Sequence, residues 1–411
     1  MKIYPSSLNG EISITGAKNA VLRYLAASIL ADKEIVLENY PLNMLDVNIH
    51  EEMLAVLGKT VAHVENVCKI SGSVNKSALI WDKRSIRNTL LIMGCLLAKT
   101  GQAKVPLPGG CPLGDRKYDI HVDLIKAFGG KVWEENGYLC AQSAGRLKGC
   151  DFHLRMRSTG ATENAILMAT LAEGESRIWN PHIRPEILDL IRLLNKMGAD
   201  ITVNGPESII IKGKESLTHN VVHYSLSDNM QALTYLIAGG IAGEELIIKN
   251  FPFRDLEIPL YFLEFSGLKY YRHDNELIVR RCTPYPIDIS TGPYPGINSD
   301  MQPLFAVWGA LSKGKSSITD LRFKGRYAYA DELGKMGVVS RVEGNTLEIV
   351  GGNVIHGNTV TALDLRAGAA LMLMALVADG PTEIKDFWMI ERGYDDVRNV
   401  LQSIGIKIEE E

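Results

Sequence analysis

A cysteine within a glycine-rich segment is the residue whose type and surroundings most directly indicate chemistry. Cys111 follows two consecutive glycines, and Arg116 lies five residues after it. Because glycine accepts backbone angles that other residues avoid, residues 107–116 are expected to form a surface loop that opens and closes. A nearby cation lowers the pKa of a thiol and increases its reactivity. Cys111 is therefore a candidate reactive thiol, and the alternative is a cysteine without a chemical role.

Several cationic side chains lie in loops or at the starts of predicted helices. An arginine at a helix start opposes the helix dipole, so Arg366 is expected to have an anionic partner. Considered singly, each cation fits a surface ion pair of small energetic value. Considered together, they indicate a site for a small, highly charged anion such as phosphate or a carboxylate. The set comprises Lys18, Arg116, Arg326, Arg366 and Arg392, with Arg87 before a further helix.

Two aspartates directly precede predicted helices. Asp300 comes before the segment 302–311, and Asp364 before the segment 366–377. An aspartate in this position commonly caps the helix, and for an isolated aspartate that is the simpler interpretation. A cationic site that also contains a loop thiol and a helix-start carboxylate is a candidate active site.

The elements that must position these side chains recur six times along the chain. Each unit contains an amphipathic helix that ends at a glycine, followed by two short strands around a turn. A second helix in each unit is apolar nearly all round, as expected of a helix buried inside a domain. The marker glycines are Gly58, Gly129, Gly198, Gly267, Gly337 and Gly405, and the buried helices are predicted over 20–30, 90–98, 163–171, 230–242, 302–311 and 366–377.

The length and number of these repeats predict the fold class. Units of about 70 residues are too long for a common solenoid repeat, and six of them divide into two halves of three. The sequence therefore predicts an α/β protein with two pseudo-threefold domains, each built from three βαβαββ-like repeats.

Composition excludes several classes of protein. The 411 residues are 46% hydrophobic and carry a net charge of −4, so nothing indicates long disorder or a nucleic-acid partner. The six cysteines form no CxxC pair, which is typical of reduced thiols in the cytoplasm. No apolar segment is long enough for a signal peptide or a membrane span, so a cytoplasmic protein without a membrane partner is expected.

Two further patterns are interpreted as structural. Residues 309–316 match the phosphate-binding pattern GxxxxGK[ST], but an apolar helix precedes them and a strand follows, which is the reverse of the required order. His219 and His223 are the only close histidine pair, and they are interpreted as two side chains on one face of a strand. No metal ion and no cofactor are expected.

Taken together, these residues resemble the enolpyruvyl transferase family from about residue 12 to 406. The motifs that carry the resemblance are SITGAKNA at 13–20, the segment 107–116 with Cys111, STGAT at 158–162, Asp300-Met301-Gln302, DLRA at 364–367 and Arg392-Gly393-Tyr394. The resemblance implies two inside-out α/β barrel domains. Residues 1–17 plus 226–411 would form one discontinuous domain, and residues 18–225 the other, which carries the Cys111 loop.

The resemblance also implies a reaction. The enolpyruvyl group of phosphoenolpyruvate would pass to a hydroxyl of UDP-N-acetylglucosamine by addition and elimination, with release of phosphate, in peptidoglycan synthesis. Fosfomycin would then alkylate Cys111. The implied catalytic residues are Cys111, Asp300, Lys18 and Arg392, and the implied substrate-binding residues are Asn19, Arg87, Arg116, Ser158, Thr159, Gly160, Phe323, Arg326, Asp364 and Arg366.

Departures from the family pattern concern the acceptor. After Arg116 the family usually continues Pro-Val-Asp, whereas this chain has Lys117-Tyr118-Asp119. Similar differences occur at 183–186, 227–231 and 324–329, while the residues implied for the donor are retained. The same chemistry on another acceptor, such as the uridine nucleotide UMP, is therefore the alternative, and a non-catalytic binding protein is a third.

Overall fold

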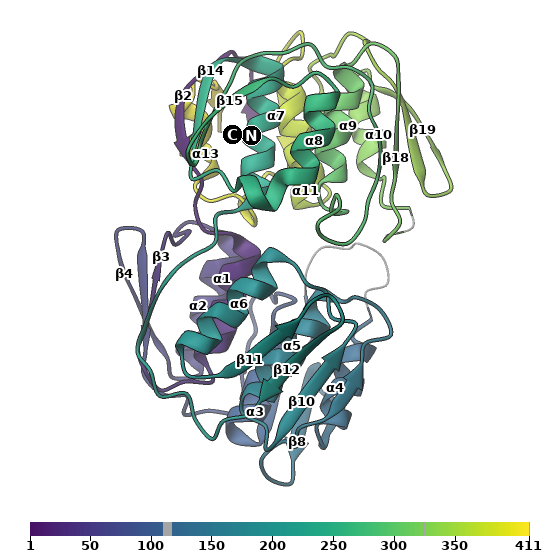
Figure 1. Cartoon of the computed structure of the whole chain (residues 1–411). Coiled ribbons are helices and arrows are strands. Elements are labelled where there is room, and N and C mark those ends of the chain that lie inside the picture. Colours follow the sequence, from purple (N-terminus) through teal and green to yellow (C-terminus); the bar gives the residue numbers. More distant parts are fainter. Residues whose placement is uncertain (110–116, 324, 411) are drawn as a thin grey trace. The chain divides into compact units, whose positions relative to one another are not determined.

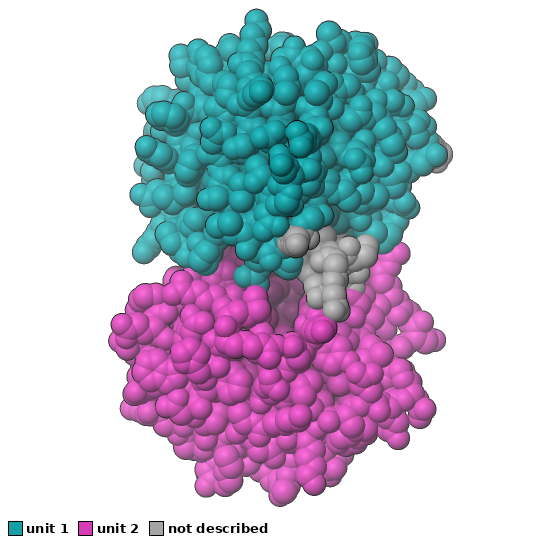
Figure 2. Space-filling model, turned by 90° about the vertical axis from the view of Figure 1, so that its right-hand side faces the viewer, with its two compact units in different colours: residues 1–15, 227–411 teal, residues 16–226 magenta. Residues whose placement is uncertain are grey.

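The computed structural model describes residues 1–109, 117–323 and 325–410 (Figure 1). The chain divides into two compact units, coloured separately in Figure 2. Unit 1 comprises Met1–Thr15 and Ser227–Glu411, and unit 2 comprises Gly16–Leu226. Both units combine helices with small sheets, so the predicted α/β class is confirmed.

Unit 2 is built around three apolar helices, α1 (Lys18–Ser28), α3 (Thr89–Thr100) and α5 (Thr159–Thr170). Nearly every residue of these helices is buried, and α3 contacts both α1 and α5. Three more amphipathic helices bury one side only: α2 (Leu45–Val56), α4 (Asp119–Ala127) and α6 (Pro185–Lys196).

Three sheets complete unit 2 in the described part of the chain. Their strand orders are β13-β3-β5-β4, β6-β8-β7 and β11-β12-β10-β9. The bounds are β3 (Ile35–Glu38), β4 (Thr60–Val64), β5 (Val67–Ser71), β6 (Gln102–Pro106), β7 (Gly130–Glu135), β8 (Tyr138–Ser143), β9 (Asp151–His153), β10 (Glu175–Trp179), β11 (Asp200–Asn204), β12 (Ser208–Lys212) and β13 (Val221–Tyr224). Each sheet contains an antiparallel hairpin, and β13–β3 and β9–β10 are parallel pairs.

Unit 1 repeats this plan around α7 (Asn229–Ala242), α9 (Gln302–Leu311) and α11 (Leu365–Ala375), which contact one another. Figure 1 shows these helices side by side. The remaining helical segments are η1 (Phe253–Leu256), α8 (Glu257–Phe265), α10 (Tyr329–Lys335), α12 (Trp388–Glu391) and α13 (Val397–Ser403).

The sheets of unit 1 have the orders β15-β16-β14-β2, β17-β18-β20-β19 and β21-β22-β1-β23. Their strands are β1 (Lys2–Ile3), β2 (Leu8–Ser13), β14 (Gly243–Lys249), β15 (Tyr270–His273), β16 (Glu276–Val279), β17 (Asp288–Ser290), β18 (Lys315–Thr319), β19 (Val339–Glu343), β20 (Thr346–Val350), β21 (Thr359–Thr361), β22 (Thr382–Lys385) and β23 (Ile408–Glu409). Because β2 pairs with β14, and β1 with β22 and β23, the N-terminal segment belongs to unit 1.

The predicted repeat markers behave as the sequence indicates. All six marker glycines have a positive φ, between 85° and 107°, and each follows a helix. Glycine adopts this left-handed conformation without the steric cost that a Cβ brings. The predicted ends of these helices are therefore confirmed.

Two interpretations of local motifs have different outcomes. α9 ends at Leu311 and β18 begins at Lys315, so the order is helix then strand, and the rejection of a phosphate-binding loop is confirmed. The interpretation of the histidine pair is wrong. His223 is buried in β13, whereas His219 lies before that strand and is exposed, because β13 begins only at Val221.

None of the described helices is long and apolar enough to cross a membrane.

Candidate active site

An ion pair between Asp300 and Arg326 is the centre of the candidate site in unit 1. Nη1 of Arg326 donates to Oδ1 of Asp300 at 2.6 Å and to Oγ of Ser299 at 3.2 Å. The arginine side chain is 7% exposed and the aspartate side chain 30% exposed, so the carboxylate remains open to a small molecule.

The interpretation of Asp300 as a helix cap is wrong. The residue that caps α9 is Met301, which makes no side-chain capping bond. The backbone N–H of Asp300 instead donates to Oδ1 of Asn298 at 3.0 Å, and its own carboxylate accepts from Arg326. A long-range ion pair thus takes the place of the local capping bond, and it holds the carboxylate of Asp300 toward Arg326.

Buried Asp320 holds the backbone around this pair, and sequence reasoning missed it. Its carboxylate accepts from Ser299 at 2.5 Å and from the side-chain amide of Gln302 at 3.2 Å. That amide also donates to the carbonyl of Arg326 at 2.9 Å, and Tyr329 donates to the other end of Gln302 at 2.7 Å. The only sequence signal for Asp320 was its position at the carboxyl end of a strand.

Arg366 contributes a buried guanidinium to unit 1. It follows Asp364, whose carboxylate caps α11 by accepting from the backbone N–H groups of Arg366 at 2.7 Å and Ala367 at 2.9 Å, so that predicted cap is confirmed. The Nε and Nη1 atoms of Arg366 make no hydrogen bond to any residue that the structure describes. Burial disfavours the charged form, but Tyr394 and the carboxylates of Asp300 and Asp228 outweigh burial and raise the pKa of this guanidinium.

Two predicted motifs meet at Gly393. A Cβ atom there would lie 2.3 Å from Cδ1 of Leu365 and 3.7 Å from Nη1 of Arg366, so a larger residue would have to displace the Leu365 side chain. Arg392, directly before this glycine, is 6% exposed, and its Nη1 lies 3.8 Å from the sulfur of Met389. The DLRA and Arg-Gly-Tyr motifs therefore bring two buried cations into one region of unit 1.

Arg326 also faces a second carboxylate and an aromatic ring. Burial acts to lower the pKa of Arg326, and the charges of Asp300 and Asp364 outweigh it and raise that pKa. The guanidinium carbon lies 5.5 Å from the centre of the Phe323 ring. The structure thus brings together four predicted residues, Asp300, Arg326, Asp364 and Arg366, with Phe323 against one of them.

In unit 2, Lys18 is the first residue of α1, as the sequence predicts. Its Nζ donates to Oδ2 of Asp46 at 3.1 Å, and both side chains are buried. Asp46 lies in the first turn of α2 and was missed, because no motif linked it to Lys18. The neighbouring Asn19 is half-buried at the same helix start. A lysine and a helix N-terminus together favour an anion.

The segment Ser158-Thr159-Gly160 forms the start of α5. Oγ of Ser158 accepts from the backbone N–H of Ala161 at 3.4 Å, and Oγ1 of Thr159 lies 2.8 Å from Nδ1 of His182. The N-terminus of a helix such as α5 favours an anion.

Buried His121 packs against this helix start and lies within the electrostatic influence of Arg87. A Cβ at Gly160 would lie 3.4 Å from Nε2 of His121, and Nδ1 of the same ring lies 3.1 Å from the side-chain amide of Asn164. Burial, with the charge of Arg87, lowers the pKa of His121 to about 3. The ring is therefore neutral, and Arg87 itself donates to the carbonyl of Lys117 at 3.2 Å.

Two predicted site residues, Cys111 and Arg116, lie outside the described residues. A possible metal-ligand group among the described residues is Glu51, His63 and Cys68, whose ligand atoms lie within 4.8 Å of one another. Burial raises the pKa of Cys68 to about 12, and Glu51 already accepts from Tyr40 and lies 3.0 Å from His63. A protonated thiol is a poor ligand, so these side chains are described by their own hydrogen bonds.

The fold and the site define the class of this protein. Residues 3–401 match the family model described as EPSP synthase (3-phosphoshikimate 1-carboxyvinyltransferase), and the chain belongs to this family of enolpyruvyl transferases. The predicted resemblance is confirmed, and the protein is an enzyme of that class.

Particular relatives are similar over the whole chain. A UDP-N-acetylglucosamine 1-carboxyvinyltransferase of Rickettsia akari is 38% identical over 98% of this chain and 97% of its own length. The protein with the same name from Finegoldia magna is 36% identical, over 98% of this chain and 96% of its own.

Solved structures show the same fold. The enolpyruvyl transferase NikO from Streptomyces tendae superimposes with a TM-score of 0.89 at 24% identity, covering 99% of this chain and 98% of its own. An EPSP synthase from Acinetobacter baumannii has a TM-score of 0.76 at 16% identity, covering 100% of this chain and 99% of its own.

Proposed function

We propose that this protein transfers the enolpyruvyl group of phosphoenolpyruvate to a hydroxyl of UDP-N-acetylglucosamine, with release of phosphate. The observation that carries the proposal is full-length identity of 36% to 38% to relatives that bear this activity in their names. The reaction belongs to peptidoglycan precursor synthesis. The lack of CxxC pairs supports a cytoplasmic location, where thiols remain reduced.

The reaction is an addition followed by an elimination. A proton adds to C3 of the donor, C2 becomes electrophilic, and the acceptor oxygen forms a bond to C2 as its hydroxyl proton is removed. The C2–O bond to phosphate then breaks, and loss of a proton from C3 restores the double bond. Asp300 is proposed to take the proton of the acceptor hydroxyl, since Arg326 orients its carboxylate.

Buried cations are proposed to hold the donor. Lys18, Arg392 and Arg366 would bind its phosphate and carboxylate, with Asp364 and Phe323 shaping the surroundings of Arg326. A buried donor group without a partner costs about 1–3 kcal/mol, and a bound anion that accepts from Nε and Nη1 of Arg366 would remove this cost. Fixed cations also stabilise the charge that develops on departing phosphate.

Residues of unit 2 are proposed to bind the acceptor and to protonate the donor. Asn19, Arg87 and the helix start at Ser158-Thr159-Gly160 supply donors suited to the diphosphate of a nucleotide sugar. From sequence alone, Cys111 is proposed to act on the donor, as a proton donor or by forming an adduct, and Arg116 to bind phosphate. Fosfomycin is accordingly expected to alkylate Cys111.

We further propose that each unit is an inside-out barrel domain of three repeats, with the boundaries 1–17 plus 226–411 and 18–225. Three buried helices and three sheets in each unit, among the described residues, support this arrangement.

The proposal is tested by phosphate release from phosphoenolpyruvate with UDP-N-acetylglucosamine, with UMP and with no acceptor. Turnover with the nucleotide sugar alone is expected. Turnover with UMP alone would support the alternative acceptor that the substitutions at Lys117 and Tyr118 raise. A protein that binds both substrates without releasing phosphate would overturn the assignment as an enzyme.

A further inference from the structure

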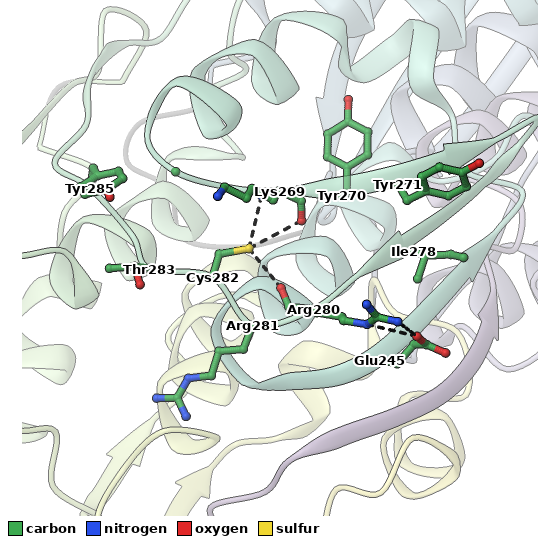
Figure 3. A pocket seen from close by; sticks show the side chains of 11 residues that line it. Glu245, Lys269, Tyr270, Tyr271, Ile278, Arg280, Arg281, Cys282, Thr283 and Tyr285 are labelled. Atoms are coloured by element: carbon green, nitrogen blue, oxygen red, sulfur yellow. Dashed lines mark hydrogen bonds and ion pairs between the residues drawn. The ribbon is translucent and has the colours of Figure 1, made fainter.

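A largely buried ion pair in unit 2 joins two of its central helices, and none of the roles proposed above involves it. Nε of Arg23 on α1 lies 2.8 Å from Oε1 of Glu163 on α5, and the two side chains are 14% and 0% exposed. By contrast, Arg280 and Glu245, which line a pocket of unit 1 (Figure 3), pair where both side chains are exposed. Surface pairs of that kind contribute little to stability. The Arg23–Glu163 pair is different, because its carboxylate has no access to water.

Stability alone does not explain such a pair. Moving two charges out of water costs free energy that their attraction returns only in part, and apolar side chains of similar size often serve as well. Burial raises the pKa of the Glu163 carboxyl, and the charge of Arg23 offsets this effect only in part. The pair is therefore better explained by what it holds in place than by the stability that it adds.

Helices α1 and α3 run in the same direction. In the first half of α1, the carbonyl of Leu22 accepts from the side-chain amide of Asn88, which directly precedes α3, at 2.8 Å. Just after the end of α1, the carbonyl of Leu30 accepts from Nζ of Lys99, in the last turn of α3, at 3.4 Å. Because the two helices are joined near their starts and again near their ends, their N-termini lie at the same end of unit 2.

Helix α5 runs in this direction too. The ring of His121 packs against Gly160 at the start of α5, and it lies within the electrostatic influence of Arg87 at the start of α3. Farther along both helices, a Cβ at Gly94 of α3 would lie 3.2 Å from Cγ of Met168 on α5. The starts of α1, α3 and α5 therefore lie at one end of unit 2, together with the partial positive charges of their N-termini.

The Arg23–Glu163 pair fixes how the first turns of α1 and α5 face each other. Residues four apart lie on the same side of a helix, one turn from each other. Asn19 comes four residues before Arg23, and Thr159 comes four residues before Glu163. Since the two helices run in the same direction, the contact between Arg23 and Glu163 places positions 19 and 159 on facing sides of the two helices, one turn nearer to their N-termini.

We propose that Arg23 and Glu163 are positioning residues for the acceptor of the transfer reaction. The pair sets the spacing between the starts of α1 and α5, so that Asn19 and the segment Ser158-Thr159-Gly160 bind the same nucleotide sugar. The inference rests on the proposed function, because it concerns the acceptor of that reaction. The pair acts through these helix starts and not by contact with the acceptor.

The test compares the steady-state kinetics of the wild type with those of the double variant Arg23→Met/Glu163→Met. Both replacements are long and apolar, so no buried charge is left unpaired and the fold is retained. The KM for UDP-N-acetylglucosamine is expected to rise about tenfold or more, because groups on two helices are no longer aligned on one ligand, while the KM for phosphoenolpyruvate stays within about threefold.

Two single variants keep the test decisive if the double variant does not fold. Arg23→Lys retains a cation that can reach Glu163, so its KM for the nucleotide sugar is expected to stay within about threefold of the wild-type value. Glu163→Gln keeps the shape of the side chain and removes its charge, so it is expected to raise the same KM. A rise with Arg23→Lys and none with Glu163→Gln would overturn the proposal.

The matched control is Tyr24→Phe, which alters the next residue of α1. It removes the hydrogen bond that Tyr24 donates to Asp189 on α6, and Asp189 keeps His223 and Arg192 as partners. A buried link from α1 to a helix other than α5 is thereby lost, and both KM values are expected to remain unchanged. Lower kcat in the double variant with both KM values unchanged would show a merely structural role and overturn the proposal.

Titration calorimetry with UDP-N-acetylglucosamine separates this inference from the proposed function. Turnover by the wild type with an acceptor KM that the double variant leaves unchanged would overturn the positioning role alone. A wild type that binds the nucleotide sugar without releasing phosphate would contradict the proposed function alone, and the double variant is then expected to raise the Kd about tenfold. A wild type that does not bind the nucleotide sugar would overturn both.

Discussion

At the scale of single residues, the site depends on charges that are buried and oriented by partners distant in the sequence. The Arg326 side chain is held by Asp300, and its carbonyl accepts from Gln302. The carboxylate of Asp320 accepts in turn from Gln302 and from Ser299. Arg366 is buried with two donor atoms unpaired among the described residues. A fixed carboxylate together with a buried cation that has two donor atoms left over suits the proposed binding of an anionic substrate with a reacting hydroxyl.

Replacing the proposed general base tests the residue scale. Asp300→Asn keeps an oxygen that accepts from Arg326 but cannot take a proton, so turnover is expected to fall by about 10²–10⁴-fold with the fold retained. Steady-state phosphate release measures the effect. Asp331→Asn, an exposed aspartate on α10, is the matched control and is expected to remain fully active. Activity of Asp300→Asn within about threefold of the wild type would remove Asp300 from its assigned role.

At the scale of elements, features that depend on residues near one another in the sequence are predicted well, and contacts between residues distant in the sequence are not. Helices and their terminal glycines follow from local periodicity and backbone preference, and the structure confirms them. Asp300 shows the limit, because the capping rule considers only the next few residues, whereas Arg326 competes for the carboxylate from 26 residues away. Asp46 and His121 were missed for the same reason, since their partners lie on other helices.

Helix packing in unit 2 gives a prediction for stability. A Cβ at Gly94 of α3 would lie 1.9 Å from Oδ1 of Asn164 on α5, and Asn164 is held by its contact with His121. Gly94→Ala is therefore expected to lower the free energy of unfolding by about 1–3 kcal/mol. Urea unfolding measures the change.

The control is another glycine within a helix. A Cβ at Gly334 of α10 meets nothing within 4 Å, so Gly334→Ala is expected to raise the free energy of unfolding by about 0.5–1 kcal/mol. If both variants shift stability in the same direction, the packing explanation for Gly94 is wrong.

At the scale of the whole molecule, two units of similar construction carry different chemical groups. The described part of unit 1 provides the Asp300–Arg326 ion pair and the buried guanidinium of Arg366, and the described part of unit 2 provides a helix-start lysine and buried histidines whose pKa values are lowered. The sequence predicts this repeat plan from period alone. It predicts the family from motifs, and full-length relatives confirm that assignment.

The buried histidines predict how the protein responds to acid. Burial and the charge of Arg23 lower the pKa of His50 from 6.5 to about 3 in the folded state. The unfolded chain therefore binds more protons between these two values, and stability falls as pH decreases below 6.5. At pH 5 the loss from His50 is about 2 kcal/mol relative to pH 7.

Urea unfolding at pH 7 and pH 5 tests this linkage. In His50→Gln the difference in unfolding free energy between the two pH values is expected to shrink by about 2 kcal/mol. His273→Gln, which replaces an exposed histidine on β15, is expected to leave the difference unchanged. An unchanged difference in His50→Gln would show that His50 does not remain neutral when folded.

The central claim is the transfer of an enolpyruvyl group to a nucleotide sugar, and identification of the product by NMR tests it most directly. The protein is incubated with phosphoenolpyruvate labelled with ¹³C at C2 and C3 and with UDP-N-acetylglucosamine. We predict a vinyl methylene signal from an enol ether whose labelled C2 couples to a proton of the sugar ring, with one phosphate released for each product formed. Phosphate release without that ether, or an ether formed only when UMP replaces the nucleotide sugar, would contradict the assigned reaction.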